Sequence, residues 1–388
     1  MLAVIADDFT GAAEIGGIGL RYGLDVIIET NVKGEVSADL LVIAADTRSM
    51  SADKAKAKIE KITKKLLKLH PEYIYKKLDS VLRGNIADEL IGQMNLCGKN
   101  RVLIVAGNPS IGRVINHGCY FVDSVPLSET FFANDPEFPI KSSLVLDIVR
   151  HSNCPVFSRI VNDELPETGL IIGDVMNQVD MGKWAEKIDN NTIAAGGSGF
   201  FDVLLKKKYI EKKQNYDHIG LSDRTLFVFG STFPKSNEIL RRLKGNGIIK
   251  MNMPEEIYRN KYFNPALIEI WKDEIARHLI KKQKVIISVE YSCRNEIGLS
   301  SRIKKIIAQL IYKVNMNIEL TDLFIEGGDT TSEILKALSI SKLFPFRELD
   351  SGIIQMKVEG YPNLCITTKP GSYIWPESIE FENNNDGY

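Results

Sequence analysis

Two adjacent carboxylates near the N-terminus are the first residues whose chemistry and position indicate a functional site. Asp7 and Asp8 directly follow the apolar run 2–6, whose length and composition predict a strand buried on both faces of a parallel sheet. In open α/β sheets, ligands bind beyond the carboxyl ends of the strands. A single carboxylate there could merely cap and solvate a loop, but a pair before a helix start favours contact with a bound group. A carboxylate so placed could orient or deprotonate a hydroxyl group.

The residues after this pair predict a helix that lies close to the sheet. We expect Thr10 to cap a helix that runs from residue 11 to about Tyr22, with Gly23 as its stop. The segment is rich in small residues, which let a helix approach the sheet and let its first amides approach a ligand. These small residues are Gly11, Ala12, Ala13, Gly16, Gly17 and Gly19.

A second group of polar residues lies in the segment 76–85, between a predicted strand and a predicted helix. Because the carboxyl ends of parallel strands share one edge of the sheet, this segment should lie beside the two carboxylates. Lys77 and Arg83 could hold an anionic ligand, the lysine as a point charge and the arginine through its fork. Asp79 and Ser80 could hold hydroxyl groups. The alternative is that Arg83 pairs with Asp79 and only holds the loop together.

Strands that alternate with helices predict a mostly parallel sheet in each half of the chain. In the first half we expect strands at 2–6, 24–28, 40–44, 73–77, 102–106, 170–173 and 192–195. In the second half we expect strands at 226–229, 248–251, 285–289, 323–326 and 363–368. Arg48 follows the third of these strands, a lysine-rich helix is expected over 51–69, and the proline-containing stretch 119–143 is expected to be irregular.

The second half of the chain contains a segment suited to phosphate groups. Gly327-Gly-Asp-Thr-Thr-Ser332 follows a predicted strand and precedes a helix expected from Glu333 to Leu338. Paired glycines at such a position offer backbone N–H groups and a helix N-terminus to phosphate oxygens. The spacing is not that of a Walker A loop. A cationic turn, Lys369-Pro-Gly-Ser372, follows the last predicted strand.

The length and charge of the chain restrict its architecture and its partners. A chain of 388 residues is too long for one ordinary core, so two domains are expected, 1–215 and 225–388, separated by a lysine-rich polar linker. The 44% hydrophobic and 26% charged fractions are typical of a soluble globular protein. With 49 Lys+Arg against 50 Asp+Glu, the chain has no general attraction for nucleic acid or anionic membranes.

The cysteines and the apolar stretches indicate a cytoplasmic protein. The five cysteines lie far apart without a Cys-x-x-Cys pair, so neither a disulfide framework nor a zinc ribbon is expected. The apolar run at the N-terminus ends too early for a signal peptide, and no apolar stretch approaches the ~18 residues that span a bilayer.

Taken together, these segments give the chain a resemblance to a known family. It resembles the four-carbon acid sugar kinases, which comprise the 3-oxo-tetronate, D-threonate and D-erythronate kinases, over nearly its whole length. The matching segments, in family order, are 6–12, 77–85, 109–118, 196–199, 230–231, 327–330 and 369–371. Each would be weak alone, but seven in sequence are specific.

The resemblance implies an ATP-dependent transfer of a phosphoryl group to a sugar-acid hydroxyl. It implies an N-terminal domain that holds the acid, a C-terminal domain that holds the nucleotide, and an active site in the cleft between them. The residues implied for the acid are Asp8, Arg48, Lys77, Asp79, Ser80 and Arg83. The residues implied for ATP are Ser231, Gly327, Gly328, Asp329, Thr330 and Gly371.

The resemblance favours Asp8 as the catalytic base, with Asp7 as the alternative. If Asp8 faces the ligand, we expect Asp7 to hold the turn or the helix start, because successive residues of an extended segment point to opposite faces. Mg²⁺ would arrive with the nucleotide and needs few protein ligands, so no residue is assigned to it. A homodimer is compatible with these expectations.

Three departures from the family pattern leave the substrate open. Val81 replaces a usual Thr, Asp329 replaces a common Glu, and Tyr373-Ile374 replaces a usual Phe-Gly pair. The acid could be a threonate, an erythronate or a 3-oxo-tetronate. The departures also motivate an alternative function, a non-catalytic protein that senses a sugar acid or nucleotide by binding it. A dinucleotide-dependent dehydrogenase is disfavoured because no Gly-x-Gly-x-x-Gly follows the first strand.

Overall fold

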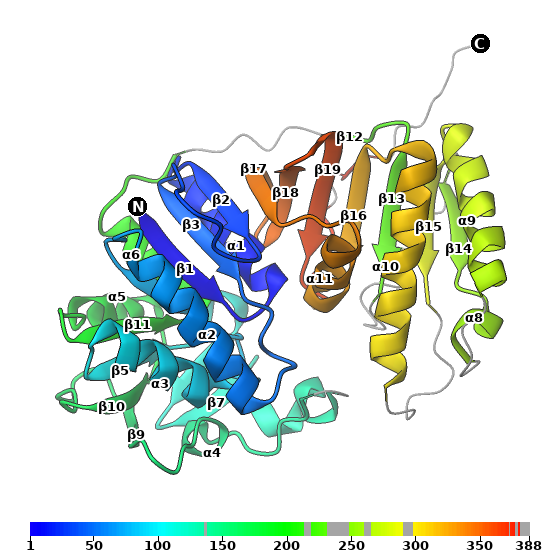
Figure 1. Cartoon of the computed structure of the whole chain (residues 1–388). Coiled ribbons are helices and arrows are strands. Elements are labelled where there is room, and N and C mark those ends of the chain that lie inside the picture. The colour runs from blue at the N-terminus through cyan, green and yellow to red at the C-terminus, as the bar shows by residue number, and fades with distance from the viewer. Residues whose placement is uncertain are drawn as a thin grey trace. The chain divides into compact units, whose positions relative to one another are not determined.

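The chain divides into two compact units, Met1–Lys212 and Lys213–Tyr388. The computed structural model describes residues 1–135, 138–212, 219–230, 248–259, 265–289, 298–371, 373–376 and 379–380. Each unit contains a mostly parallel sheet flanked by helices (Figure 1). The α/β fold class predicted from the sequence is therefore confirmed.

The sheet of the N-terminal unit consists of parallel strands whose carboxyl ends share one edge. In sheet order the strands are β2 (Val26–Glu29), β3 (Leu40–Ala44), β1 (Leu2–Ala6), β4 (Ile74–Lys77), β11 (Thr192–Gly196), β5 (Arg101–Val105), β10 (Gly169–Gly173) and β9 (Val156–Arg159). β1 and β3 are buried along their whole length, as their unbroken apolar sequences predict. The register pairs Ala6 with Ala44 on one side and with Lys77 on the other. The loops that follow β3, β1 and β4 are therefore neighbours.

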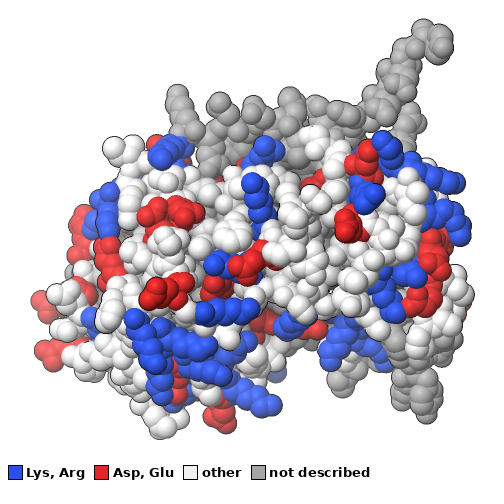
Figure 2. Space-filling view, turned by 45° about the horizontal axis from the view of Figure 1, so that its top comes forward, with Lys and Arg blue, Asp and Glu red and all other residues white. Residues whose placement is uncertain are grey.

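Helices cover this sheet, and one of them presents lysines outward. They are α1 (Phe9–Arg21), α2 (Ala52–Leu67), α3 (Ile86–Cys97), α4 (Val145–Ile148), α5 (Gln178–Glu186) and α6 (Ser198–Lys206). A Cβ atom on Gly19 of α1 would lie 2.7 Å from Leu40 and 2.8 Å from Val26, so the predicted close approach of this helix to the sheet is confirmed. The exposed residues of α2 include Lys54, Lys61 and Lys64, and Figure 2 shows Lys and Arg side chains gathered on this unit.

The stretch 119–143 is more regular than predicted. A small antiparallel sheet contains β6 (Arg113–Asn116), β7 (Cys119–Val122) and β8 (Val125–Pro126), and it is accompanied by the 3₁₀ helices η1 (Pro109–Ile111), η2 (Leu127–Glu129) and η3 (Phe131–Asn134). Its strands are joined by two-residue turns in which all four residues have positive φ. Such turns match the twist of a hairpin. The residues in them, His117-Gly118 and Asp123-Ser124, lack the usual Asn-Gly signal, and this is why the sequence did not reveal the hairpins.

The C-terminal unit has a sheet with two parts. In sheet order its strands are β14 (Ile248–Asn252), β15 (Lys284–Ser288), β13 (Thr225–Phe229), β16 (Asp322–Glu326), β19 (Tyr361–Lys369), β18 (Ile353–Val358) and β17 (Lys342–Asp350). The first five are parallel, whereas β19, β18 and β17 form an antiparallel meander. The sequence analysis did not identify β17 and β18. A short parallel pair, β12 (Ile219–Gly220) and β20 (Ile379–Glu380), stands apart from this sheet.

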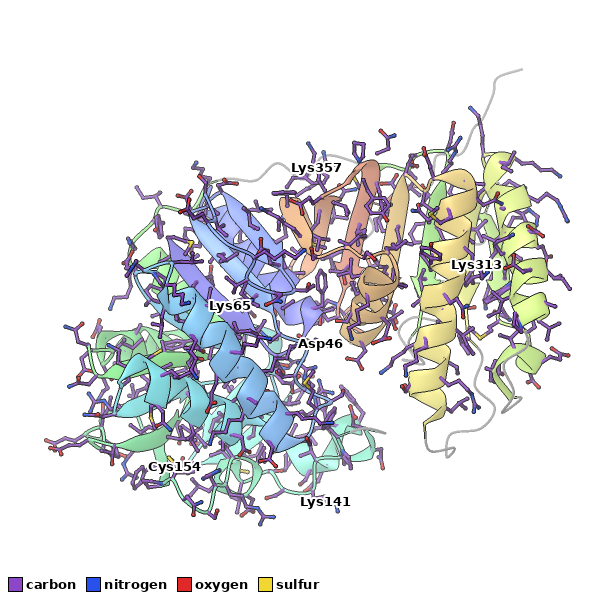
Figure 3. The ribbon with its side chains drawn as sticks, in the orientation of Figure 1. Asp46, Lys65, Lys141, Cys154, Lys313 and Lys357 are labelled. Atoms are coloured by element: carbon purple, nitrogen blue, oxygen red, sulfur yellow. The ribbon has the colours of Figure 1, made fainter. Side chains whose placement is uncertain are left out.

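The helices of the C-terminal unit lie against its parallel strands. They are α8 (Glu255–Arg259), α9 (Pro265–Ile280), α10 (Leu299–Ile318) and α11 (Gly328–Ala337). Lys313 of α10, labelled in Figure 3, forms an ion pair with Glu269 of α9. The helix predicted to begin at Glu333 instead begins at Gly328. Gly327 and Gly328, the glycines suited to phosphate groups, therefore lie at the start of the helix rather than in a loop before it.

The turn after β11 generates a prediction about stability. Gly196 has φ +153°, and a Cβ atom there would lie 2.0 Å from the carbonyl oxygen of Val105. Gly196→Ala should lower the free energy of unfolding by at least about 2 kcal/mol, because the methyl group meets a backbone atom that cannot move aside. Gly182 of α5 is a matched control, since nothing lies within 4 Å of its Cβ position. Gly182→Ala should stabilise the protein by roughly 0.5–1 kcal/mol. Denaturant unfolding measures both, and equal effects would contradict the argument.

Candidate active site

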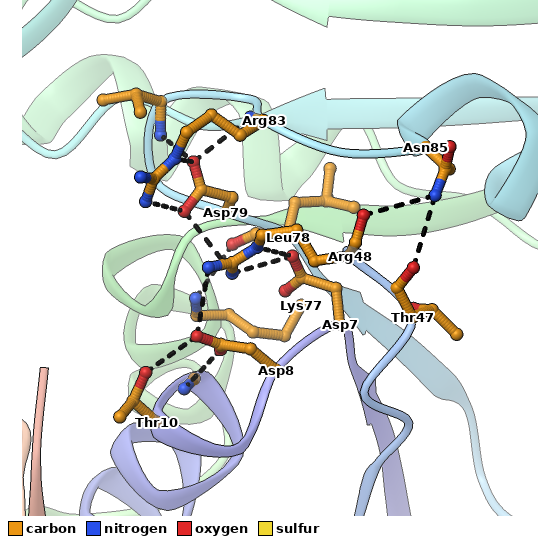
Figure 4. Close-up of polar contacts among 12 residues, drawn as sticks. Asp7, Asp8, Thr10, Thr47, Arg48, Lys77, Leu78, Asp79, Arg83 and Asn85 are labelled. Carbon is orange, nitrogen blue, oxygen red and sulfur yellow. Dashed lines mark hydrogen bonds and ion pairs between the residues drawn. The ribbon is translucent and has the colours of Figure 1, made fainter. Parts of the chain in front are cut away.

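Three loops converge where β3, β1 and β4 end side by side (Figure 4). Asp7 and Asp8 follow β1, Arg48 follows β3, and Lys77 and Asp79 lie at the end of β4. A backbone hydrogen bond of 2.9 Å from the Thr47 N–H to the Asp7 carbonyl ties the first two loops together. The structure thus brings together the predicted acid-binding residues of the N-terminal unit.

Arg48 is the centre of this cluster. Its Nε and Nη2 atoms each lie 2.8 Å from Oδ2 of Asp7, its Nη1 lies 3.1 Å from Oδ2 of Asp8, and its Nη2 lies 3.4 Å from Oδ1 of Asp79. Burial lowers the pKa of Arg48, but the three carboxylates raise it well above its ordinary value. The guanidinium is therefore a permanent cation that holds three carboxylates from two loops.

Asp8 holds the start of α1, and this corrects two predictions. Its Oδ1 accepts the Gly11 N–H at 2.7 Å, and its Oδ2 accepts the Thr10 hydroxyl at 2.8 Å. The helix therefore begins at Phe9 with Asp8 as its N-cap, so the expected cap by Thr10 is wrong. Of the two roles expected for Asp7, the turn or the helix start, the helix start belongs to Asp8 instead. A carboxylate at the N-cap both reaches the third amide and interacts favourably with the helix dipole.

The two neighbouring aspartates have opposite electrostatic environments. Burial raises the pKa of Asp7 most strongly and the charge of Asp8 adds to it, so the shift is upward despite the nearby cations. Burial also raises the pKa of Asp8, but Arg48, Lys77 and its two hydrogen bonds outweigh burial and lower it. Within the described part of the chain, Oδ1 of Asp7 is buried and has no hydrogen-bond partner.

Arg83 directs its fork at a protein carboxylate. Its Nε and Nη2 lie 2.9 Å and 2.7 Å from the two oxygens of Asp79, and its Nη1 lies 2.8 Å from Asp135. Asp79 also accepts the N–H groups of Val81 and Arg83 at 3.1 Å each. The structure thus contains the pairing of Arg83 with Asp79 that the sequence left as an alternative. Burial raises the pKa of Asp79, but Arg83 and Arg48 hold it well below its usual range.

Lys77 and Ser80, the other residues of this segment predicted to bind the acid, lie outside the ion pairs described above. The Nζ atom of Lys77 donates to the Leu78 carbonyl at 2.8 Å and lies 3.7 Å from Oε2 of Glu14. Ser80 is half-buried, and its carbonyl accepts the Tyr120 hydroxyl. The side chain of Val81 is fully buried in the hydrophobic core of the unit. Val81, which stands where the family usually has Thr, is therefore a residue of the hydrophobic core.

The C-terminal unit places its predicted nucleotide residues at the start of α11. Gly327 is the N-cap residue with φ 97°, and Gly328, Asp329 and Thr330 form the first helical turn. A Cβ atom on Gly230 would lie 2.5 Å from Oγ1 of Thr330, so the backbone after β13 lies directly against the Thr330 side chain. Gly327 and Gly328 are half-exposed, and their backbone N–H groups could donate hydrogen bonds to phosphate oxygens. Asp329 is paired with Lys304 of α10.

The turn that carries Gly371 is held by a buried lysine. The Nζ atom of Lys369 lies 3.1 Å from Oε2 of Glu326 and donates to the carbonyls of Pro370 and Tyr373 at 3.0 and 2.7 Å. Lys369 and Glu326 face each other because β19 and β16 pair in that register. Sequence reasoning treated Lys369 only as a cationic turn residue, since strand register cannot be read from the sequence. Ser231, the remaining predicted ATP contact, lies outside the described residues.

Neither a metal site nor a membrane helix is found in the described ranges. No group of three or more His, Cys, Asp or Glu side chains among those residues could hold a metal ion. None of the helices described there is both long and apolar enough to cross a membrane.

Comparisons with known proteins place both units in named domain families. Residues 2–204 match the model of a sugar-binding N-terminal domain, and residues 226–373 match that of a nucleotide-binding C-terminal domain. These two matches cover most of the chain.

Relatives with assigned names are similar over most of their length. A D-threonate kinase from Salmonella typhimurium is 24% identical, and the match covers 87% of this chain and 86% of the relative. A D-erythronate kinase from Heliobacterium modesticaldum is 23% identical over 88% and 86% of the two chains. A 3-oxo-tetronate kinase from Brucella melitensis is 29% identical over 96% and 92%.

A solved structure shares the fold. It is that of a Salmonella typhimurium protein described as a putative tRNA synthase, with a TM-score of 0.77 and 17% sequence identity, and the match covers 96% of each chain. At this identity the likeness concerns the fold alone.

The buried contacts of Asp79 generate a prediction about stability and pH. Asp79→Asn should lower the free energy of unfolding at neutral pH by roughly 3 kcal/mol or more, because two partly buried arginines lose a buried anionic partner. The pKa of Asp79 is lowered in the folded protein, so its contribution is present above the unfolded pKa and is lost as the pH falls through the folded pKa. The difference between wild type and variant should therefore shrink in acid.

A matched control for this prediction is the exposed Asp53 in the first turn of α2. Asp53→Asn should cost only about 0.5 kcal/mol, the loss of one favourable interaction with a helix dipole. Thermal denaturation from neutral to acidic pH measures both variants. A loss for Asp79→Asn no larger than that of Asp53→Asn would contradict the assignment.

Proposed function

The chain belongs to the four-carbon acid sugar kinase family, and we propose that it transfers the γ-phosphoryl group of ATP to a hydroxyl of a four-carbon sugar acid. The observation that carries the proposal is the buried cluster in which Arg48 meets three carboxylates at the carboxyl ends of β1, β3 and β4. Such a cluster offers cations to an acid group and carboxylates to hydroxyl groups, and these are the chemical features of a sugar acid.

The acid is proposed to bind through Arg48 and the segment from Lys77 to Arg83. Every cation of this cluster already faces a protein carboxylate, so an incoming carboxylate has to replace one of them. The 3.4 Å contact between Arg48 and Asp79 is the longest of the three ion pairs of Arg48, and it is the one that an acid would replace with least loss. Asp79 and Ser80 then contact hydroxyl groups of the acid, as does Asp8.

The nucleotide is proposed to bind at the start of α11. Amides of Gly327 and Gly328 would hold phosphate oxygens, with Asp329, Thr330 and the turn at Gly371 nearby. Phosphoryl transfer depends mainly on positioning and charge neutralisation, and Mg²⁺ bound with ATP supplies part of that neutralisation. Few protein ligands are needed for Mg²⁺, so the site requires no dedicated metal cluster. A cytoplasmic homodimer stays a prediction from the sequence.

The direct test of this proposal is turnover. Wild-type protein with MgATP should release ADP in the presence of at least one acid from a panel of D-threonate, D-erythronate and their 3-oxo analogues. It should release far less ADP without an acid, since hydrolysis by water lacks the positioned acceptor. Binding of an acid without any ADP release would instead support the sensor alternative, which the named relatives do not favour.

The division of substrates between the two units predicts opposite effects of two substitutions. Gly328→Val should abolish ATP binding and spare acid binding, because its side chain occupies the space where phosphate oxygens approach the amides. Arg48→Ala should raise the KM for the acid by about 10- to 150-fold and leave the KM for ATP nearly unchanged, since a charge-assisted hydrogen bond is worth about 1.5–3 kcal/mol.

A companion variant guards against misfolding. Arg48→Lys keeps a cation among the three carboxylates but lacks the planar fork, so it should fold and still raise the KM for the acid. Calorimetric titration with ATP and steady-state kinetics measure both substrates. Unaltered ATP affinity in folded Gly328→Val, or an unaltered acid KM in both Arg48 variants, would contradict the respective assignment.

A further inference from the structure

The oxygens of Asp8 are occupied by permanent protein donors. One oxygen accepts the Gly11 amide, and the other accepts the Thr10 hydroxyl and faces Arg48. These contacts fix the start of α1, so proton uptake by Asp8 would weaken the helix cap as well as the ion pair. Asp8 is suited to remain charged throughout a reaction cycle and poorly suited to exchange a proton.

The two oxygens of Asp7 differ from each other in their partners. Its Oδ2 is fixed by two nitrogens of Arg48 at 2.8 Å. Its Oδ1 is buried and lacks a hydrogen-bond partner among the residues that the structure describes. Native proteins satisfy nearly all buried polar atoms, and exceptions often mark a functional role. Figure 4 shows the carboxylate of Asp7 beside the Arg48 guanidinium and near Lys77.

We propose that Asp7, and not Asp8, is the base that accepts the proton of the attacking hydroxyl group. This assignment rests on the kinase function proposed above and reverses the preference that the family resemblance gave. The unpartnered Oδ1 receives the hydroxyl hydrogen bond of the acid, while Arg48 holds Oδ2 and thereby fixes the orientation of the carboxylate.

Proton transfer accompanies the transfer of the phosphoryl group in this step. The O–H bond of the acid breaks, and its proton passes to Oδ1 of Asp7. The oxygen forms a bond to the γ-phosphorus of ATP, and the bond from that phosphorus to the β–γ bridging oxygen breaks with its electron pair left on ADP. Asp8 keeps its charge and contacts the acid from the N-terminus of α1, so it contributes to binding.

The charged groups around Asp7 give it a proton affinity suited to this task. Arg48 from the loop after β3 and Lys76 and Lys77 of β4 favour its ionised form, whereas burial and neighbouring Asp8 favour its protonated form. Lys76 is itself fully buried and paired with Glu89 at 2.8 Å. The net effect raises the pKa of Asp7 while that of Asp8 is lowered. A pair of carboxylates whose environments separate their proton affinities is the pattern expected of divided roles.

The test compares Asp7→Asn with Asp8→Asn as matched isosteric variants of the full chain. Asp7→Asn should lower kcat by roughly 10²- to 10⁴-fold, the usual contribution of a positioned base, with little change in ATP binding. Asp8→Asn should mainly raise the KM for the acid and lower the melting temperature, because the helix cap weakens. Asp7→Glu, which restores a carboxylate, should recover part of the lost kcat.

Two readouts separate a base from a merely structural residue. The acidic limb of the kcat/KM profile should persist in Asp8→Asn and vanish in Asp7→Asn. The second readout is the division of the effect between kcat and KM, since Asp7→Asn should act mainly on kcat and Asp8→Asn mainly on the KM for the acid.

The outcomes distinguish the two proposals. Wild-type turnover with an unchanged kcat in Asp7→Asn, or a larger kcat loss in well-folded Asp8→Asn, would overturn the assignment of Asp7 and leave the kinase function standing. Absence of ADP release by wild type with every acid would overturn the kinase function, and the assignment of a base would fall with it.

Discussion

The N-terminal site depends on one constraint, that three buried carboxylates surround one partly buried guanidinium. A buried charge is tolerated only where partners surround it with good geometry. Arg48 finds them because β3, β1 and β4 are adjacent parallel strands, so that the loop carrying Asp7 and Asp8 and the loop carrying Asp79 end beside it. The apolar sequences of β1 and β3 matter to function for this reason. They fix the strands whose ends bring the charges together.

The C-terminal unit also contains an ion pair at the ends of adjacent parallel strands. Lys369 and Glu326 lie at the ends of two paired parallel strands, and both are almost fully buried. The lysine holds the carbonyls of the turn that contains Gly371, while Glu326 directly precedes Gly327 and the start of α11. A buried ion pair thus fixes the two backbone segments for which nucleotide contacts are proposed. Rigid backbone at such a site lowers the entropic cost of binding phosphate groups.

The sequence located the candidate residues but, apart from the pairing of Arg83 with Asp79 that it left open, not their partners. Asp7, Asp8 and Gly327 were recognisable because each follows an apolar strand, and strand ends define an edge of a parallel sheet. The N-cap role of Asp8 was missed because Asp8 and Thr10 both have side chains typical of N-caps, and only the backbone conformation decides between them. The pairing of Lys369 with Glu326 depends on register, which a single sequence does not specify.

Elements also escaped prediction for physical reasons. The strands β17 and β18 belong to an antiparallel meander whose charged residues interrupt the apolar pattern, as in Arg347 and Lys357. The hairpins around β7 use turns without the usual asparagine and glycine pair, so positive φ values at His117 and Asp123 became visible only in the structure. The sequence therefore located the residues that directly follow an apolar strand, but not the residues whose position depends on local turn geometry.

The central claim is that Arg48 recognises the carboxylate of a four-carbon acid, and a thermodynamic cycle tests it most directly. Calorimetry would compare the preferred acid with the four-carbon polyol that lacks the carboxylate, in wild type and in Arg48→Gln. The account predicts that wild type prefers the acid by about 10- to 150-fold, the value of a charge-assisted hydrogen bond, and that Arg48→Gln loses most of this preference. An equal preference for the acid in both proteins would contradict it.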